Sequence, residues 1–149
     1  MYKNIDLTEM RILPVNIPSE LEGLSIHDVQ QEFFLKDLIN HNGEYQCQID
    51  DVYIHDNALV LFQYSNSIVA IAVLDKVVES ESVRSDYGKY CFNINSIAIF
   101  NPITSVEMKK LFRINKLSMA KQRLELSKKK TLLDVLSKKG ITYCNSTIA

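Results

Sequence analysis

The chain has 149 residues, of which 46% are hydrophobic and 23% are charged, and its formal net charge is −1. This apolar content excludes a disordered chain, because enough surface can be buried to offset backbone entropy. No stretch reaches the roughly 18 apolar residues of a membrane span, and the first residues lack the basic and apolar regions of a signal peptide. We therefore expect a single domain over residues 1–149, located in the cytoplasm, with no membrane partner.

The N-terminal part of the chain predicts one short extended segment and one helix. Residues 11–15 (RILPV) are β-prone but contain a proline, which lacks a ladder donor, so we expect an edge strand or a loop. Ser25 can cap a helix that runs to about Asn40. The apolar face of this helix comprises Ile26, Val29, Phe33, Phe34 and Leu38. Asn42 and Gly43 are typical of its end.

The middle of the chain predicts strands. Residues 45–49 alternate between polar and apolar side chains. Two apolar runs, residues 59–64 and 67–78, flank the turn pair Ser65 and Asn66. Two apolar runs around a two-residue polar turn indicate a β-hairpin.

The C-terminal part begins with a strand and continues with helices. Residues 90–100 predict one long strand with a bulge near Asn95, and Asn101 and Pro102 are expected to end it. Residues 104–107 (TSVE) fit a capping box. The buried side of the helix that follows is expected to comprise Val106, Met108, Leu111 and Phe112. A last apolar stripe over residues 132–136 predicts a further helix ended by Gly140.

This order of elements decides the expected fold class. One helix, then several strands, then helices favours an α+β domain, with a small, mostly antiparallel β-barrel or curved sheet and flanking helices. Regular alternation of strands and helices is missing, which argues against a doubly wound parallel sheet. Basic helices are expected from about residue 105 onward.

Charge is distributed unevenly along the chain. Residues 1–104 hold 6 basic and 15 acidic residues, a net of −9, whereas residues 105–149 hold 11 basic and 3 acidic residues, a net of +8. Such asymmetry is a sign of a face for nucleic acid or another polyanion, although lysines on a helix can also form a solvated surface. The candidate phosphate-contacting residues are Lys109, Lys110, Arg113, Lys116, Lys121 and Arg123.

The sequence offers little for catalysis. It contains none of the common phosphate-loop, dinucleotide, zinc-protease or hydrolase motifs, so we expect no catalytic residues, no cofactor and no metal. Asp50, Asp51 and Asp56 could hold a divalent ion for a nuclease, with Asp75 and Lys76 nearby, but aspartates in these contexts are also common turn residues. The three cysteines, at positions 47, 91 and 144, have no metal-site spacing and are expected to be free thiols.

Six aromatic residues fall on the predicted strands: Tyr45, Tyr53, Phe62, Tyr64, Tyr90 and Phe92. Alternation within a strand places Phe62 and Tyr64 on one face. Rings on such a face can stack nucleobases, at about 1–3 kcal/mol per base, or they can form the hydrophobic core. The candidate nucleic-acid-binding rings are Tyr45, Phe62, Tyr64 and Tyr90.

Four segments between Gly43 and Phe112 resemble a PUA-like domain of the EVE/ASCH kind. They read GEYQCQ, IHDNALVLFQYSNSIVAIAVLDKVVE, YGKYCFNINSIAIFNPIT and SVEMKKLF. The chain departs from the family pattern at His55 and Ala70, where glycines are usual. The resemblance covers about half of the chain and implies a PUA-like fold.

The same resemblance implies a module that binds DNA or RNA, including readers of modified or flipped bases, some of them in restriction systems. Phe62 and Tyr64 would then lie near a base pocket, and residues 109–130 would contact phosphates. Two alternatives remain open. One is a protein-interaction or inhibitor domain of phage or mobile-element origin that presents the acidic residues of 1–104 to a protein partner. The other is the metal-dependent nuclease.

Overall fold

A computed structural model of the chain describes residues 2, 5–15, 23–48, 54–79, 87–114, 117 and 122–143. Within these residues, eight strands form an open sheet in the order β2-β5-β4-β3-β1-β7, with β6 pairing β4 and β8 pairing β6. The strands are β1 (Met10–Pro14), β2 (Glu44–Gln48), β3 (Leu59–Tyr64), β4 (Ser67–Glu79), β5 (Tyr87–Phe92), β6 (Ala98–Thr104), β7 (Gln122–Leu124) and β8 (Thr142–Tyr143). Apart from the parallel pair β1/β3, the described pairs are antiparallel, which confirms the predicted α+β class.

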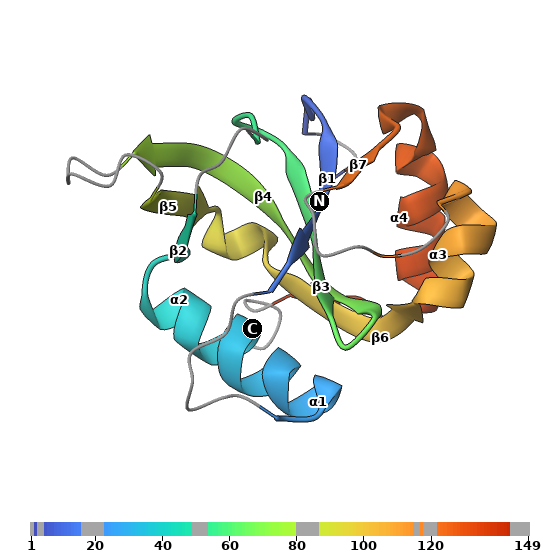
Figure 1. The fold of residues 1–149 in the computed structure, drawn as a ribbon, viewed down its shortest axis with the longest axis horizontal. Coiled ribbons are helices and arrows are strands. Elements are labelled where there is room, and N and C mark those ends of the chain that lie inside the picture. Colours follow the sequence, from blue (N-terminus) through green and yellow to red (C-terminus); the bar gives the residue numbers. More distant parts are fainter. Residues whose placement is uncertain are drawn as a thin grey trace.

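The helices form two groups. Three consecutive segments, α1 (Ile26–Val29), a π-helical stretch (Gln30–Asp37) and α2 (Leu38–Asn40), make one continuous helix, called here the 26–40 helix. The second group consists of α3 (Ser105–Phe112) and α4 (Lys129–Lys138). Short 3-10 turns at Ile94–Ser96 and Leu126–Lys128 complete the described structure. Figure 1 shows the 26–40 helix on one side of the curved sheet and α3 and α4 on another.

Alternate residues of the strands enter two separate cores on the two faces of the sheet. Val60 and Phe62 of β3 pack with the 26–40 helix in the first core. Leu59 and Leu61 of the same strand pack with α3 and α4 in the second core. This division follows from the two-residue period of a strand. Both faces of the sheet are therefore covered, which explains the nearly unbroken apolar runs of β3 and β4.

The 26–40 helix begins and ends as predicted. The Ser25 side chain accepts a hydrogen bond from the Asp28 amide at 3.2 Å, which satisfies one free N–H of the first turn. At the other end, Asn42 and Gly43 have φ values of 57° and 78° and turn the chain into β2. A Cβ atom at Gly43 would lie 2.1 Å from the carbonyl oxygen of Phe92, so this position requires glycine.

The predicted hairpin is also confirmed. Strands β3 and β4 pair in antiparallel register from Leu59 with Val73 to Tyr64 with Ser67. The turn residues Ser65 and Asn66 have φ values of 50° and 60°, as a two-residue hairpin turn requires.

Strand β1 is not the edge strand or loop that its proline predicted. It lies between β3 and β7 and pairs with both. The pairing with β7 covers only Met10–Ile12, so Pro14 sits beyond the last position where an N–H would be needed on that side.

The single strand predicted over residues 90–100 is two strands. A 3-10 turn at Ile94–Ser96 separates β5 from β6, because the chain changes its partner region along β4. The Ser96 hydroxyl accepts the Val73 amide at 2.8 Å and donates to the Asn93 carbonyl at 2.7 Å. These bonds fix the turn against the middle of β4.

Asn101 and Pro102 do not end β6, which continues to Thr104. The β4–β6 register shifts between Ile68, paired with Ile103, and Ala70, paired with Ile99. Three β6 residues therefore lie opposite one β4 residue, and this stretch is called here the β6 bulge. The bulge accommodates a proline that cannot donate to the ladder, and the Asn101 amide donates instead to the Lys139 carbonyl at 2.9 Å.

Helix α3 opens with the predicted capping box between Thr104 and Glu107. Met108 and Phe112 are buried as expected, but Val106 is 74% exposed because it lies in the first turn on the outer side of the helix. The segment beyond α3 is not helical throughout, since Arg123 lies on strand β7.

Candidate nucleic-acid interface

Three of the four candidate rings belong to the first core. Phe62 is 0% exposed, and Tyr45 and Tyr90 are also buried. The Phe62 ring lies 4.9 Å from Phe34 and 5.2 Å from Phe92, centroid to centroid. A base has no access to rings packed in this way, which corrects the expected aromatic-lined surface. The reason is the 26–40 helix, which covers the face of β3 that carries Phe62.

Tyr64 is the exception among the four rings. It lies at the end of β3, is half-buried, and its hydroxyl donates to the Leu24 carbonyl at 2.7 Å. A role for this ring in binding stays a prediction.

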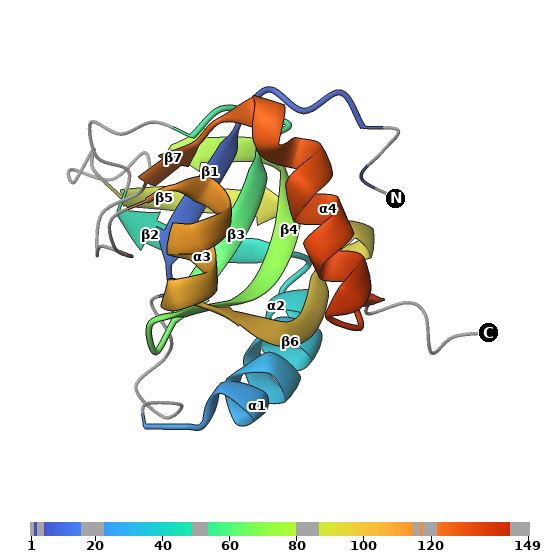
Figure 2. The same ribbon diagram turned by 90° about the vertical axis from the view of Figure 1, so that its right-hand side faces the viewer.

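The basic residues of α3 and α4 form an exposed layer. Figure 2 shows the two helices side by side in front of the sheet. The exposed cations of this layer, called here the α3/α4 layer, are Lys109, Lys110, Arg113, Lys130 and Lys138. Within the described part of the chain, none of these five side chains has a carboxylate at ion-pair distance. Two other predicted contacts, Lys116 and Lys121, lie outside the described residues.

Two neighbouring lysines have structural partners instead. Lys129 donates to the Ile5 carbonyl at 3.1 Å. Lys139 forms an ion pair with Glu107 at 2.8 Å and donates to the Pro102 carbonyl at 3.3 Å. The hydrogen bond from Lys139 holds the pKa of the Glu107 carboxyl below its usual value, with help from the Thr104 amide and against partial burial. These lysines tie helices to the rest of the domain and are not free to contact phosphate.

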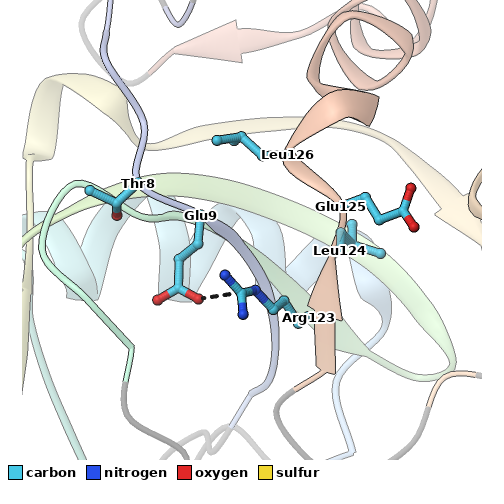
Figure 3. A pocket seen from close by; sticks show the side chains of 6 residues that line it. All are labelled: Thr8, Glu9, Arg123, Leu124, Glu125 and Leu126. Atoms are coloured by element: carbon cyan, nitrogen blue, oxygen red, sulfur yellow. Dashed lines mark ion pairs between the residues drawn. The ribbon is translucent and has the colours of Figure 1, made fainter.

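Arg123 does not join the α3/α4 layer. Leu124 points into the second core, so its neighbour on β7 projects from the opposite face of the sheet. There Arg123 lies 3.9 Å from Glu9 and is 68% exposed (Figure 3). It lines a pocket of about 370 Å³ together with Thr8, Glu9, Leu124, Glu125 and Leu126.

Glu9 is a buried carboxylate held by several donors. Its side chain is 2% exposed; Oε1 accepts from Arg11 Nε at 2.7 Å and Oε2 accepts from the His55 amide at 2.8 Å. Burial raises the pKa of this carboxyl, but the His55 amide and the Arg11 guanidinium together outweigh burial and lower it below the usual value. The cluster of Glu9, Arg11 and Arg123 fixes the start of β1 to its neighbours.

A further pocket, of about 430 Å³, lies where the 26–40 helix meets the β6 bulge. Its wall includes Gln30, a buried polar residue on the apolar face of the helix. Gln30 is not among the candidate residues predicted from the sequence. Its signal in the sequence is a glutamine that directly follows Val29 and precedes Phe33 by one turn, within an otherwise apolar stripe.

The residues proposed for a nuclease do not assemble a site within the described ranges. No group of three or more His, Cys, Asp or Glu side chains there is placed to hold a metal ion. Asp56 is an exposed turn residue whose carbonyl accepts from Thr8 at 2.8 Å, and Asp50 and Asp51 lie outside the described residues. Burial raises the pKa of the Cys91 thiol, and nearby Glu44 raises it further. The described helices include none that is long and apolar enough to cross a membrane.

Comparison with known proteins gives structural matches only. No protein-family profile and no curated protein sequence matches the chain. The crystal structure of ASCH from Zymomonas mobilis is 8% identical, with a TM-score of 0.56 over 91% of this chain and 97% of that one. The N-terminal domain of Thermococcus gammatolerans McrB bound to m5C DNA is 11% identical, with a TM-score of 0.47 over 87% of this chain and 98% of that one. The chain therefore has the fold of an ASCH domain, which confirms the PUA-like architecture predicted from its sequence.

Proposed function

We propose that the chain is a non-catalytic module that binds DNA or RNA through the α3/α4 layer. The observation that carries this proposal is the set of five exposed cations on two adjacent helices and at the end of α3, none of them paired with a described carboxylate. A lysine or arginine that is already held in a salt bridge contributes little binding free energy when it contacts a phosphate. Free ones displace condensed counterions from a nucleic acid, which favours binding.

The PUA-like fold also supports a function in nucleic-acid binding. Members of the PUA-like superfamily, which the sequence resembles, commonly bind RNA or DNA. The cations of the α3/α4 layer would contact phosphates, and such contacts position a nucleic acid without reading its sequence. Reading of a modified or flipped base is the finer form of the proposal. It requires a separate base pocket, since Tyr45, Phe62 and Tyr90 are buried.

The proposal is tested by measuring affinity for fluorescent single- and double-stranded DNA and RNA as a function of salt. We expect affinity to fall about tenfold or more between roughly 50 and 200 mM salt, as phosphate contacts by several cations predict. The double variant Lys110→Glu/Lys130→Glu reverses one charge on each helix and should weaken binding by about tenfold or more at low salt.

A matched control reverses two exposed lysines elsewhere. Lys36 lies on the 26–40 helix and Lys76 on β4, so Lys36→Glu/Lys76→Glu changes the net charge equally without touching the α3/α4 layer. Affinity for nucleic acid should change much less in this variant. Absence of binding to every nucleic acid at low salt, or an equal loss in both double variants, would overturn the proposal. The alternative of a protein partner for the acidic residues of 1–104 stays a prediction.

A further inference from the structure

Strands β2 and β7 form the two ends of the main path of the sheet, and their outer edges differ (Figure 1). An open edge presents unpaired N–H and C=O groups to other chains, so proteins usually shorten such an edge, charge it or interrupt it. Strand β7 is three residues long and carries the exposed Arg123 at its middle position. Its edge is therefore short and charged, which disfavours pairing with another chain.

Strand β2 is longer and more regular. It comprises five residues, EYQCQ, and contains neither lysine nor proline. Its register with β5 runs without a shift from Glu44 opposite Cys91 to Gln48 opposite Tyr87, so no bulge interrupts it. Glu44 is its one charged residue, stands at the first position and forms an ion pair with Lys89 at 3.5 Å. Among the described strands, β5 alone pairs with β2, which leaves the other side of β2 as an unprotected edge.

The backbone groups of every second residue of β2 point away from β5. The Phe92 amide donates to the Gly43 carbonyl at 2.9 Å, which makes these two residues a hydrogen-bonded pair of the ladder. Hydrogen-bonded pairs alternate with non-bonded pairs between antiparallel strands. Tyr45 therefore bonds to β5, whereas the N–H and C=O groups of Glu44 and Gln46 are directed outward.

The centre of this edge is open to a further strand. The Glu44 amide donates to the His41 carbonyl at 3.0 Å, which agrees with its outward direction. Gln46, in the middle of β2, has an exposed side chain. Within the part of the chain that the structure describes, its outward N–H and C=O groups have no hydrogen-bond partner. Gln46 thus offers one donor and one acceptor to a strand from outside.

We propose that β2 pairs with β2 of a second copy of this chain, in antiparallel orientation and with Gln46 on the two-fold axis. In this register the two Gln46 residues exchange both of their outward backbone hydrogen bonds. Gln48 of each copy lies opposite Glu44 of the other. The one carboxylate of each edge therefore faces an uncharged residue, and like charges are not placed opposite each other. The sheets of the two copies then form one continuous sheet.

The chemistry of the edge favours a second copy over a charged peptide. The charge of Glu44 is already balanced by Lys89, so it gives little attraction for a basic or acidic partner. The exposed Gln46 amide can donate and accept at the same time, which makes it complementary to an identical amide on the axis. The pairing involves few hydrogen bonds, so we expect a weak dimer with a dissociation constant of roughly 10 µM to 1 mM.

A charge exchange at Gln46 tests both the dimer and its register, with association measured by analytical ultracentrifugation. Gln46→Lys and Gln46→Glu each place two like charges opposite each other across the axis. Each variant alone should therefore dimerise about fivefold more weakly than the wild type. An equimolar mixture should associate at least as well as the wild type, because a lysine then lies opposite a glutamate. A residue that faces itself in the dimer gives this recovery, whereas a residue that faces any other position does not.

A second variant tests the backbone bonds. Gln46→Pro removes the outward N–H of this residue but no hydrogen bond to β5, a position at which an edge strand tolerates proline. It should weaken dimerisation by at least about tenfold. The matched control Gln46→Thr keeps the N–H and a residue suited to a strand, and should dimerise within about twofold of the wild type. Thermal unfolding confirms that each variant is folded.

The inference is overturned if the wild type stays monomeric up to about 2 mM, or if the mixture of charged variants associates no better than either variant alone. It is also overturned if a folded Gln46→Pro protein dimerises like the wild type. This inference does not rest on nucleic-acid binding. The variant Lys110→Glu/Lys130→Glu should dimerise like the wild type, since both substitutions lie on helices remote from β2 in the sequence.

Discussion

The 26–40 helix and the α3/α4 pair cover opposite faces of one sheet, and both bury an apolar side, but they differ in charge. The 26–40 helix carries one lysine and three acidic residues, a net of −2. Helices α3 and α4 together carry five lysines and two acidic residues, a net of +3. The formal net charge of −1 therefore conceals a basic layer and an acidic layer on one small domain.

The two cores beneath these layers differ as well. The first core contains six buried aromatic residues that contact one another, namely Phe33, Phe34, Tyr45, Phe62, Tyr90 and Phe92. The second core is mainly aliphatic. In this domain, clustered aromatic rings mark a buried core, whereas exposed cations mark the outer helix surface that is available to a partner.

The largest expected effect tests the aromatic core directly. Phe62→Ala should lower the free energy of unfolding by about 4 kcal/mol, because it leaves a cavity among packed rings. Leu136→Ala, in the second core, should cost about 3 kcal/mol. Urea denaturation measures both. The milder Phe62→Leu should keep the fold and the wild-type affinity for nucleic acid; a folded variant with lost affinity would return this ring to the binding site.

The next effect concerns the carboxylate that stabilises the start of β1. Glu9→Ala should lower the free energy of unfolding by about 3 kcal/mol, since it leaves the half-buried Arg11 without its partner and the His55 amide without an acceptor. Glu125→Ala, in the same pocket but exposed, should stay within about 0.5 kcal/mol of the wild type. An equal loss of unfolding free energy in the two variants would show that the burial of Glu9 does not contribute to stability.

Glu9 should also make the stability of the fold depend on pH. Its pKa is lowered in the folded state, so its stabilising contribution is complete above the unfolded value near 4.5 and is lost as the pH falls through the folded value. Denaturation curves at pH 7 and below 4.5 should therefore differ more for the wild type than for Glu9→Ala. A pH dependence of the same size in both proteins would exclude this carboxylate as its source.

Substitution of two buried glutamines should have smaller effects on stability, and the two effects should be opposite in sign. Gln30→Met should cost about 2 kcal/mol, because the carbonyls of Val69 and Phe100 lose their donor. Gln63 is buried with no hydrogen-bond partner for Oε1 among the described residues. Gln63→Met should thus be neutral or raise stability by about 1 kcal/mol. Thermal unfolding of the two variants distinguishes a glutamine that bridges strands from one that does not.

The smallest effect lies in the basic layer itself. Thr104→Ala removes the N-cap of α3 and should lower the free energy of unfolding by about 1 kcal/mol. Ser137→Ala, on the exposed side of α4, should change stability by less than about 0.5 kcal/mol. Nucleic-acid affinity should be unchanged in both, because neither residue is a cation of the α3/α4 layer. Weaker binding by Thr104→Ala would indicate that the orientation of α3 matters for recognition.

Local signals predicted much of the fold. The Ser25 cap, the Ser65–Asn66 turn and the Thr104 capping box were all identified because their hydrogen bonds join residues close in sequence. Features that depend on residues far apart in the sequence were not predicted. The split of β5 from β6 depends on which part of β4 each strand pairs with, and the central place of β1 depends on β7, more than 100 residues later.

The candidate site was predicted less well, for a related reason. Basic composition located Lys109 and Lys110 on an exposed helix and Arg113 directly after it, but it could not show that Arg123 projects from the other face, because that depends on strand register. Strand alternation placed Phe62 and Tyr64 together correctly but could not show that a helix covers the first of them. Gln30 gains its fixed orientation only from two strands that are distant in sequence.

The position of β1 also bears on how the protein is made. Ile12 lies between β3 and β7, and Tyr2 packs against Tyr143 with ring centroids 5.7 Å apart. During synthesis, β1 therefore lacks its partner β7 until nearly the whole chain has left the ribosome. The sheet is completed on this side only when β7 has been synthesised. A chain that ends after α3 would therefore leave the edge of β1 unpaired, and an unpaired strand edge promotes aggregation.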